Sequence, residues 1–435
     1  MKARTRPTLG AVTPVTPLAS DELWSAMSDT PTIAPTLTHP ADGGPRQAGR
    51  PQGVLLMFMS CLPVLGAVLL APVLPSMQGH FGDTAQAKAL VPLSLTVPAL
   101  MIALLAPFAG RVVDRFGRKR LLLVGLVVYA AFGTAPLWLD GLPAIVLSRV
   151  GVGVAEAAIM TCCTTLIADY FSGPQRDRWL GLQTVFASLS ATLFFAIGGG
   201  LGAHSWRTPF WLYASSLIFA VLAAALLWQP QPSAENPSGT PRTALPPLPV
   251  RALLAPCLVS VFGGMVFYAP IVELPFVLDH AGIDAVPVIG AITALASAAT
   301  AAGAFTFGRV SSKGTATLLP IAFALAGVGL VTVGLAGSVP VIVVGAVITS
   351  GGTGLLLPTL LVWALVGLKF EQRGRGTGLW TAALFLGEFV CPLLVLALSA
   401  ALGGLGAALI LLGAAALVAG VACRAALTRT ATVLA

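Results

Sequence analysis

The sequence predicts an all-α membrane protein with 12 transmembrane helices in two pseudo-symmetric halves of six. Three observations support this prediction. Of the 435 residues, 57% are hydrophobic and only 9% are charged, with a mean hydropathy of +0.92. Apolar runs of about 20 residues recur along the chain, and each is long enough to cross a bilayer as a helix. The basic residues gather in the segments between these runs, as in membrane proteins of fixed topology.

Helices are the expected spanning element because lipid offers no partner for unpaired backbone groups. Tight hairpins at Gly337 and at Gly403 separate two pairs of neighbouring runs. The apolar segments are 53–76, 89–109, 119–139, 143–168, 178–203, 207–228, 252–278, 286–308, 316–336, 339–367, 377–400 and 403–424.

Composition changes mark the boundaries of the predicted domains. Residues 1–52 are rich in Pro and Thr and lack an apolar run, which is typical of a disordered tail. Seven Pro residues fall between Gln229 and Val250, which predicts a linker. The predicted parts are a tail (1–52), a first six-helix half (53–228), a linker (229–251), a second six-helix half (252–424) and a second tail (425–435).

The two halves contain a sequence repeat. The tripeptide Gly110–Val112 recurs as Gly308–Val310, and the segment Arg176–Leu182 shares its Arg-x-Arg-x-x-Gly-Leu pattern with Arg373–Leu379. Both pairs are separated by nearly the same number of residues. This spacing indicates a duplicated six-helix unit, with its copies related about an axis along the membrane normal.

The distribution of basic residues predicts that both termini are cytoplasmic. With that topology, only Lys88 and Arg207 of the 24 Lys and Arg residues fall in outside loops, and only Arg149 falls within a span. All the others lie in the tails, the linker or the inside loops, which agrees with the excess of Lys and Arg on the cytoplasmic side.

Several other classes of function find little support. The net charge of +8 comes from loop residues, so no nucleic-acid partner is expected. The six Cys residues lie in or at the ends of apolar runs without metal-ligand spacing, so no metal or other cofactor is expected. No nucleophile–base constellation suggests a membrane enzyme, and no repeated filter sequence suggests a channel.

One short loop carries the most specific signal. Residues Gly110–Arg120 read G-R-V-V-D-R-F-G-R-K-R between the second and third apolar segments. The loop resembles the signature loop of the major facilitator superfamily. The residues in register with that motif are Gly110, Asp114, Arg115, Gly117 and Arg118.

The resemblance implies a role for Asp114 as a latch. In the family, the equivalent acid holds the cytoplasmic ends of the two halves together in one state. Here it would face the start of the eleventh helix, where a helix N-terminus favours an anion. We expect Arg373 and Arg375 just before that start, so these residues complete the predicted latch. The alternative is that Asp114 only offsets the positive charge of its own loop.

The fourth apolar segment carries two ionisable residues, which are functional candidates by default. Arg149 is followed by Gly153 and Glu156, in an order that resembles the family's second motif. Arg149 and Glu156 are seven positions apart, so they share one helix face at a separation of about 10 Å. The resemblance implies that this Arg eases proton exchange with an acid. The alternative is that Arg149 and Glu156 pair with each other or satisfy groups of a neighbouring helix, without a part in coupling.

Two further acids lie in the second half. Glu273 is bracketed by Pro270 and Pro275 near the outer end of its span, where a position at the water-exposed rim is the alternative to a functional one. Glu388 lies in the middle of the eleventh segment, at a depth that suits binding and release of a proton or contact with a cationic substrate. We expect Glu388 and Glu156 to face the central cavity.

Aromatic side chains are the remaining candidates for substrate contact. Tyr268 and Trp380 are the two that we expect to line a cavity, with ordinary packing as the alternative for each.

The fifth apolar segment helps to indicate which branch of the family this sequence resembles. It contains the glycine-rich run Gly198–Gly202 of drug–proton antiporters, without their Pro, and the following Trp206–Phe210 resembles a junction found in bacterial efflux members. The resemblance implies a monomeric multi-pass protein of the bacterial inner membrane that exports drug-like small molecules in exchange for protons. The alternative is a proton-coupled uptake symporter. Spans poor in Asn, Gln and Lys favour an apolar substrate.

Overall fold

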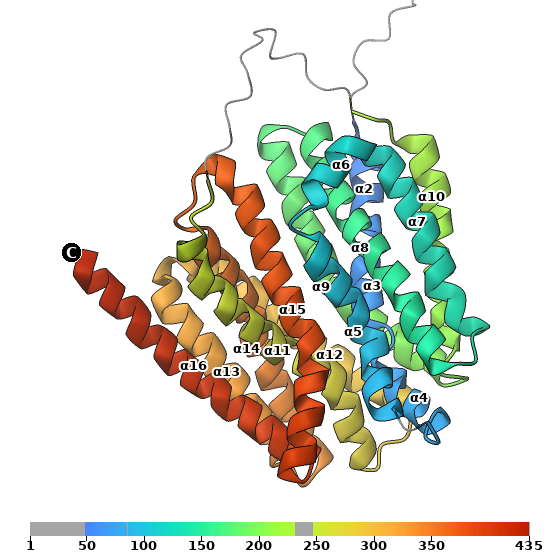
Figure 1. Cartoon of the computed structure of the whole chain (residues 1–435), viewed down its shortest axis with the longest axis vertical. Helices are drawn as coiled ribbons and strands as arrows, with labels where there is room; N and C mark the ends of the chain where they lie inside the picture. Colours follow the sequence, from blue (N-terminus) through green and yellow to red (C-terminus); the bar gives the residue numbers. More distant parts are fainter. Residues whose placement is uncertain (1–47, 85, 231–246, 435) are drawn as a thin grey trace, which may run out of the picture. The chain divides into compact units, whose positions relative to one another are not determined.

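A computed structural model describes residues 48–84, 86–230 and 247–434 (Figure 1). The described residues form helices without strands, and twelve helical spans are long and apolar enough to cross a membrane. This confirms the predicted all-α class with twelve spans. Most of the predicted N-terminal tail and residues 231–246 of the predicted linker lie outside the described residues.

The first half comprises the six spans between Arg50 and Leu226. Its segments are α2 (Arg50–Met59), α3 (Leu62–Val68), η1 (Ala71–Val73), α4 (Leu74–His80), α5 (Ala87–Leu105), α6 (Ala109–Phe116), α7 (Arg118–Thr134), η2 (Ala135–Leu137), α8 (Leu142–Tyr170), α9 (Gly173–Gly202), η3 (Thr208–Ala214) and α10 (Ser215–Leu226).

The second half comprises the six spans between Val250 and Thr428. Its segments are α11 (Val250–His280), α12 (Val286–Val310), η4 (Ser311–Lys313), α13 (Thr315–Gly334), α14 (Val339–Leu365), α15 (Phe370–Leu402) and α16 (Leu405–Leu434).

The first span is divided into short helices rather than being one continuous helix. Pro63 stands in the first turn of α3, Pro72 in η1 and Pro75 in the first turn of α4. Proline has no backbone N–H and clashes with the preceding turn, so each of these residues starts a new helical segment. The division leaves carbonyl groups at the end of α3 without donors from their own helix.

Two helices begin earlier than the apolar runs predict. α9 begins at Gly173, and α15 begins at Phe370. Arg373 and Arg375 therefore lie in the first turns of α15 instead of just before it. Hydropathy detects only the part of a helix that suits lipid, and these polar first turns extend past that part.

Corresponding turns in the two halves share one backbone conformation. Gly117 caps the start of α7 with φ 83°, and Gly314 caps the start of α13 with φ 75°. Both angles lie in the region that residues with a side chain rarely adopt. We call the end of the helices with these two turns the basic end, and the end with the loops around Gly282 and Gly403 the opposite end.

The halves meet mainly through two pairs of helices, α9 with α12 and α5 with α15, and α11 and α12 also contact the first span. Toward the opposite end, Gly199 and Gly290 are so close that a Cβ atom on Gly199 would lie 2.7 Å from the Cα atom of Gly290. Small residues allow such close approach of membrane helices. Nearer the middle of the same pair, the Thr192 hydroxyl donates to the Ser297 hydroxyl at 3.2 Å.

Candidate functional site

Glu156 is a buried carboxyl on α8. The residue is 1% exposed, and its Oε1 atom has no hydrogen-bond partner among the described residues. The carboxylate lies against Gly66 of α3, where a Cβ atom would overlap Oε1 and stand 3.4 Å from the Tyr129 hydroxyl. The absence of a side chain at position 66 therefore provides the space that the carboxylate occupies.

Glu388 also lies next to a first-span glycine of its half, through its backbone rather than through its carboxylate. It is buried on α15, and α15 packs there on Gly264 of α11. A Cβ atom at position 264 would overlap the Leu384 carbonyl oxygen and lie 3.3 Å from the Glu388 amide nitrogen. Gly66 and Gly264 stand 198 positions apart, which is the spacing of the predicted repeat. Each half thus places one acid beside a glycine of its first span.

The two acids and Tyr268 lie close together where the halves meet. Electrostatic interactions link Glu156 with Glu388 and link both with the Tyr268 phenol. Tyr268 is 1% exposed on α11, and its hydroxyl donates to the carbonyl oxygen of Ala67 on α3 at 2.8 Å. The structure therefore brings three of the predicted site residues into one buried region.

Arg149 is buried on α8 and directed toward α7 and η3. Its Nη2 atom donates to the carbonyl oxygens of Phe132 at 2.7 Å and Gly133 at 3.2 Å, which belong to the last turn of α7. Its guanidinium lies over the rings of Phe210 and Tyr213, at 5.2 and 5.3 Å from their centroids. A cation suits the negative end of α7 and the faces of aromatic rings.

Arg149 and Glu156 form no direct ion pair among the described residues, although they interact electrostatically. The Nη1 atom of Arg149 has no described hydrogen-bond partner. The predicted proton exchange between Arg149 and an acid stays a prediction.

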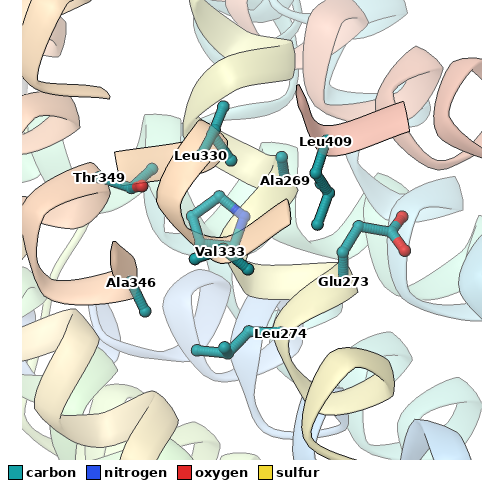
Figure 2. Close-up of a pocket in the computed structure, with 9 residues that line it drawn as sticks. Ala269, Glu273, Leu274, Leu330, Val333, Ala346, Thr349 and Leu409 are labelled. Carbon is teal, nitrogen blue, oxygen red and sulfur yellow. The ribbon is translucent and has the colours of Figure 1, made fainter. Parts of the chain in front are cut away.

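Glu273 lies apart from this region, within the second half. It lines a cavity of about 10 Å³, which has room for about one water molecule, together with apolar residues of α11, α13, α14 and α16. Figure 2 shows the Glu273 carboxylate pointing away from Thr349 and Ala346 on the other side of the cavity. Glu273 is thus buried among helices of its own half.

The signature loop forms its own network at the basic end. Asp114, whose side chain is 74% exposed, pairs with Arg118 at 3.7 Å, and Arg118 also pairs with Asp169 of α8 at 2.6 Å. The ion pair described for Asp114 is thus the one within its own loop. Arg115 is exposed, and no atom lies within 4 Å of where a Cβ on Gly110 would stand. The predicted latch stays a prediction.

Trp380 is half-buried near the first turns of α15. It packs against a small apolar cluster that contains Leu253, Ala364 and Leu368, and its indole Nε1 has no hydrogen-bond partner among the described residues. An unpaired indole N–H is a candidate donor to a bound molecule.

Two tyrosines in this region were not predicted from the sequence. The Tyr129 hydroxyl donates to the Leu62 carbonyl at 2.6 Å, and Tyr213 packs on Tyr129 at 4.9 Å between ring centroids. The chain has only four Tyr but 20 Phe. Because a buried phenol needs a hydrogen-bond partner, the few Tyr residues in apolar spans were a usable signal for this polar network.

The buried acids define what the site can do chemically. A carboxyl in an apolar surrounding can bind a proton, release it or neutralise a cation. The described residues contain no group of three His, Cys, Asp or Glu side chains that could hold a metal ion. The two buried acids could take part in reversible binding of a proton or a charged small molecule.

Comparisons with known proteins identify related sequences. The family model of the Major Facilitator Superfamily matches residues 56–313. Multidrug resistance protein 1 of Bacillus subtilis is 28% identical over 187 residues, which cover 42% of this chain and 46% of that protein. The class B tetracycline resistance protein of Escherichia coli is 29% identical over 180 residues, which cover 40% of this chain and 43% of that protein. The matches thus span about half the length of these relatives.

Solved structures share the fold over most of the chain. A D-xylose–proton symporter has a TM-score of 0.70 at 16% identity, covering 86% of this chain and 96% of its own. A bacterial homologue of the human lysosomal transporter Spinster, in an inward-facing conformation, has a TM-score of 0.67 at 17% identity, covering 87% and 96%.

Proposed function

Because this chain belongs to the major facilitator superfamily, we propose that it is a proton-driven antiporter that exports apolar or amphipathic drug-like molecules. It is a multi-pass membrane transporter of small molecules, and the proposal concerns its direction, coupling and substrate class. The observation that carries the proposal is the pair of buried acids, Glu156 and Glu388, one from each half. Relatives named for resistance to tetracycline and quinolones support the direction of transport.

In the proposed mechanism, the two halves rock about the region that holds the acids, so that access alternates between the two membrane faces. Glu388 binds a proton from the outside, and a substrate from the inside displaces it. A neutral carboxyl tolerates the apolar surroundings, whereas an ionised one favours either a cationic substrate or contact with water. Glu156 modulates the charge of the same region through its interaction with Glu388.

The proposal includes a topology. The basic end faces the cytoplasm of a bacterial cell, with both chain termini on that side, because nearly all Lys and Arg outside the spans gather there. A monomer is sufficient for this function because both halves belong to one chain.

The proposal also includes the latch at the basic end. In one of the two states, Asp114 contacts the first turns of α15, near Arg373 and Arg375. Ala106, which directly follows α5, already lies next to α15, since a Cβ atom on Gly378 would be 3.1 Å from its carbonyl oxygen. Asp114→Asn is expected to abolish transport and leave membrane insertion unchanged. Unchanged transport would exclude the latch.

Transport in everted vesicles tests the main proposal. Vesicles with an acid interior are loaded with a pH-sensitive dye, and lipophilic cations, neutral antibiotics, sugars or organic acids are added in turn. For an antiporter, an apolar compound raises the internal pH and restores the dye signal. Glu388→Gln is expected to remove this response.

Two further variants assign the coupling acid. Glu273→Gln changes a buried carboxyl in the small cavity of the second half and is expected to leave the response in place, whereas Glu156→Gln is expected to weaken it. A response only to a polar nutrient in right-side-out vesicles would contradict export and favour an uptake symporter. A response that survives Glu388→Gln would assign the coupling to another acid.

A further inference from the structure

The division of the first span leaves an acceptor without a donor from its own helix. α3 ends at Val68, and the next helical segment begins at Ala71, next to Pro72. The last carbonyl groups of a helix have no intrahelical donor. The carbonyl of Ala67 belongs to this last turn, and its described donor is the Tyr268 hydroxyl at 2.8 Å.

This hydrogen bond crosses from one half to the other. Ala67 lies in the first span of the first half, and Tyr268 lies in the first span of the second half. Tyr268 is buried and Ala67 is partly buried, so the phenol would lack a partner if the bond broke without entry of water. The bond is therefore a directional connection between the two moving units.

The hydrogen bond also lies between the two acids. Ala67 follows Gly66, against which the Glu156 carboxylate packs, and Tyr268 comes one helical turn after Gly264, where α15 brings in Glu388. A movement that separates α3 from α11, and so gives solvent at the opposite end access to the acids, must break this bond.

We propose that Tyr268 is a positioning residue for transport, whose hydroxyl clasps the Ala67 carbonyl in one state of the transporter and releases it to water in the other. The clasp favours closure of the halves toward the opposite end. This inference rests on the rocking of the halves in the proposed function. Because water replaces the bond in the open state, its loss shifts the ratio of the two states by roughly fivefold, the worth of one net hydrogen bond.

Hydrogen–deuterium exchange of the full-length protein in lipid nanodiscs tests the clasp. Tyr268→Phe removes only the hydroxyl. Peptides at the opposite end, which cover residues 79–88 and 281–288, are expected to exchange faster than in the wild type. Peptides at the basic end, which cover residues 106–121 and 366–378, are expected to exchange more slowly, because opening at one end closes the other.

Tyr129→Phe is the matched control. Its hydroxyl donates to a carbonyl of the same helix α3, at 2.6 Å, and the Tyr129 side chain is as buried as that of Tyr268, but both partners belong to the first half. Loss of this bond is expected to loosen α3 and α7 locally, without opposite changes at the two ends.

The pattern of the exchange decides the proposal. Faster exchange at one end together with slower exchange at the other, in Tyr268→Phe alone, supports the clasp. Exchange unchanged from the wild type, or faster at both ends as in general loosening, overturns it. The measurement needs no substrate, so a failure of the transport assay would count against the proposed function and not against the clasp.

Discussion

At the scale of single residues, the buried acids depend on neighbours that have no side chain. Gly66 leaves room for the Glu156 carboxylate, and Gly264 lets α15 approach with Glu388. Both glycines occupy the first span of their half, at positions related by the repeat. The acids therefore keep their places through main-chain packing instead of through salt bridges.

Gly66→Ala is expected to displace the Glu156 carboxylate and to lower stability by about 1–3 kcal/mol, the usual cost of overpacking. Thermal unfolding in detergent measures the change. Gly79→Ala in α4 is the control, because a Cβ there meets no atom within 4 Å and alanine is the better helix former. Equal melting temperatures for the two variants would show that the carboxylate does not need this space.

Arg149→Lys keeps the charge but loses the planar group that reaches two carbonyls of α7 and two aromatic rings. We expect a loss of roughly 1.5–3 kcal/mol, typical of hydrogen bonds to a charged group. Thermal unfolding of the variant tests this expectation. A variant as stable as the wild type but inactive in transport would instead favour the predicted role of Arg149 in proton exchange.

The sequence allowed the acids to be identified but not their surroundings. Glu156 and Glu388 stand out because charges in apolar spans are rare. Their glycine neighbours lie on other helices, so no local pattern marks them. Glu273 shows the same limit of sequence analysis. Its place along the span left a position at the water-exposed rim open, but packing with α13, α14 and α16 buries it.

At the scale of elements, the turns at the basic end repeat in geometry as well as in sequence. Gly117 and Gly314 have the same unusual backbone conformation at equivalent turns. Asp114 has no acidic counterpart at the equivalent position 312, which is Ser. The turn was therefore retained in both halves, whereas the acid of the latch occurs in only one.

Gly117→Ala is expected to destabilise the turn by about 1–3 kcal/mol, because its φ of 83° with an extended ψ strains any residue with a side chain. Gly110→Ala, in the helix just before, meets no neighbouring atom and is expected to be neutral or slightly stabilising. Chemical denaturation of the two variants provides the comparison. Equal stability would mean that the turn relaxes without cost.

The sequence predicts that the helices exist more accurately than it predicts where each helix begins and ends. All twelve apolar runs correspond to described helical spans. The first span is not one continuous helix because its prolines divide it into short segments. The positions of these prolines are visible in the sequence, but an average of hydropathy does not detect such a division. α9 and α15 differ because their first turns are polar and helical outside the expected apolar run.

At the scale of the whole molecule, the halves touch through main chain at Gly199 and Gly290. Gly199→Val is expected to wedge the halves apart there and to lower transport about tenfold, since overpacking by about 1.4 kcal/mol changes an equilibrium tenfold. The vesicle assay measures the rate. Gly200→Val is the control, because the neighbouring position meets nothing within 4 Å. Similar rates for both variants would contradict a role for this contact.

The contact between Gly199 and Gly290 has a further consequence for speed. Interlocking side chains would have to disengage each time the halves moved, and that disengagement would add to the activation barrier. Two glycines have no side chains to disengage, so in the proposed rocking motion this contact would offer little resistance. In the proposed cycle, the rate then depends on the few hydrogen bonds between the halves, so a change of single polar atoms would alter it.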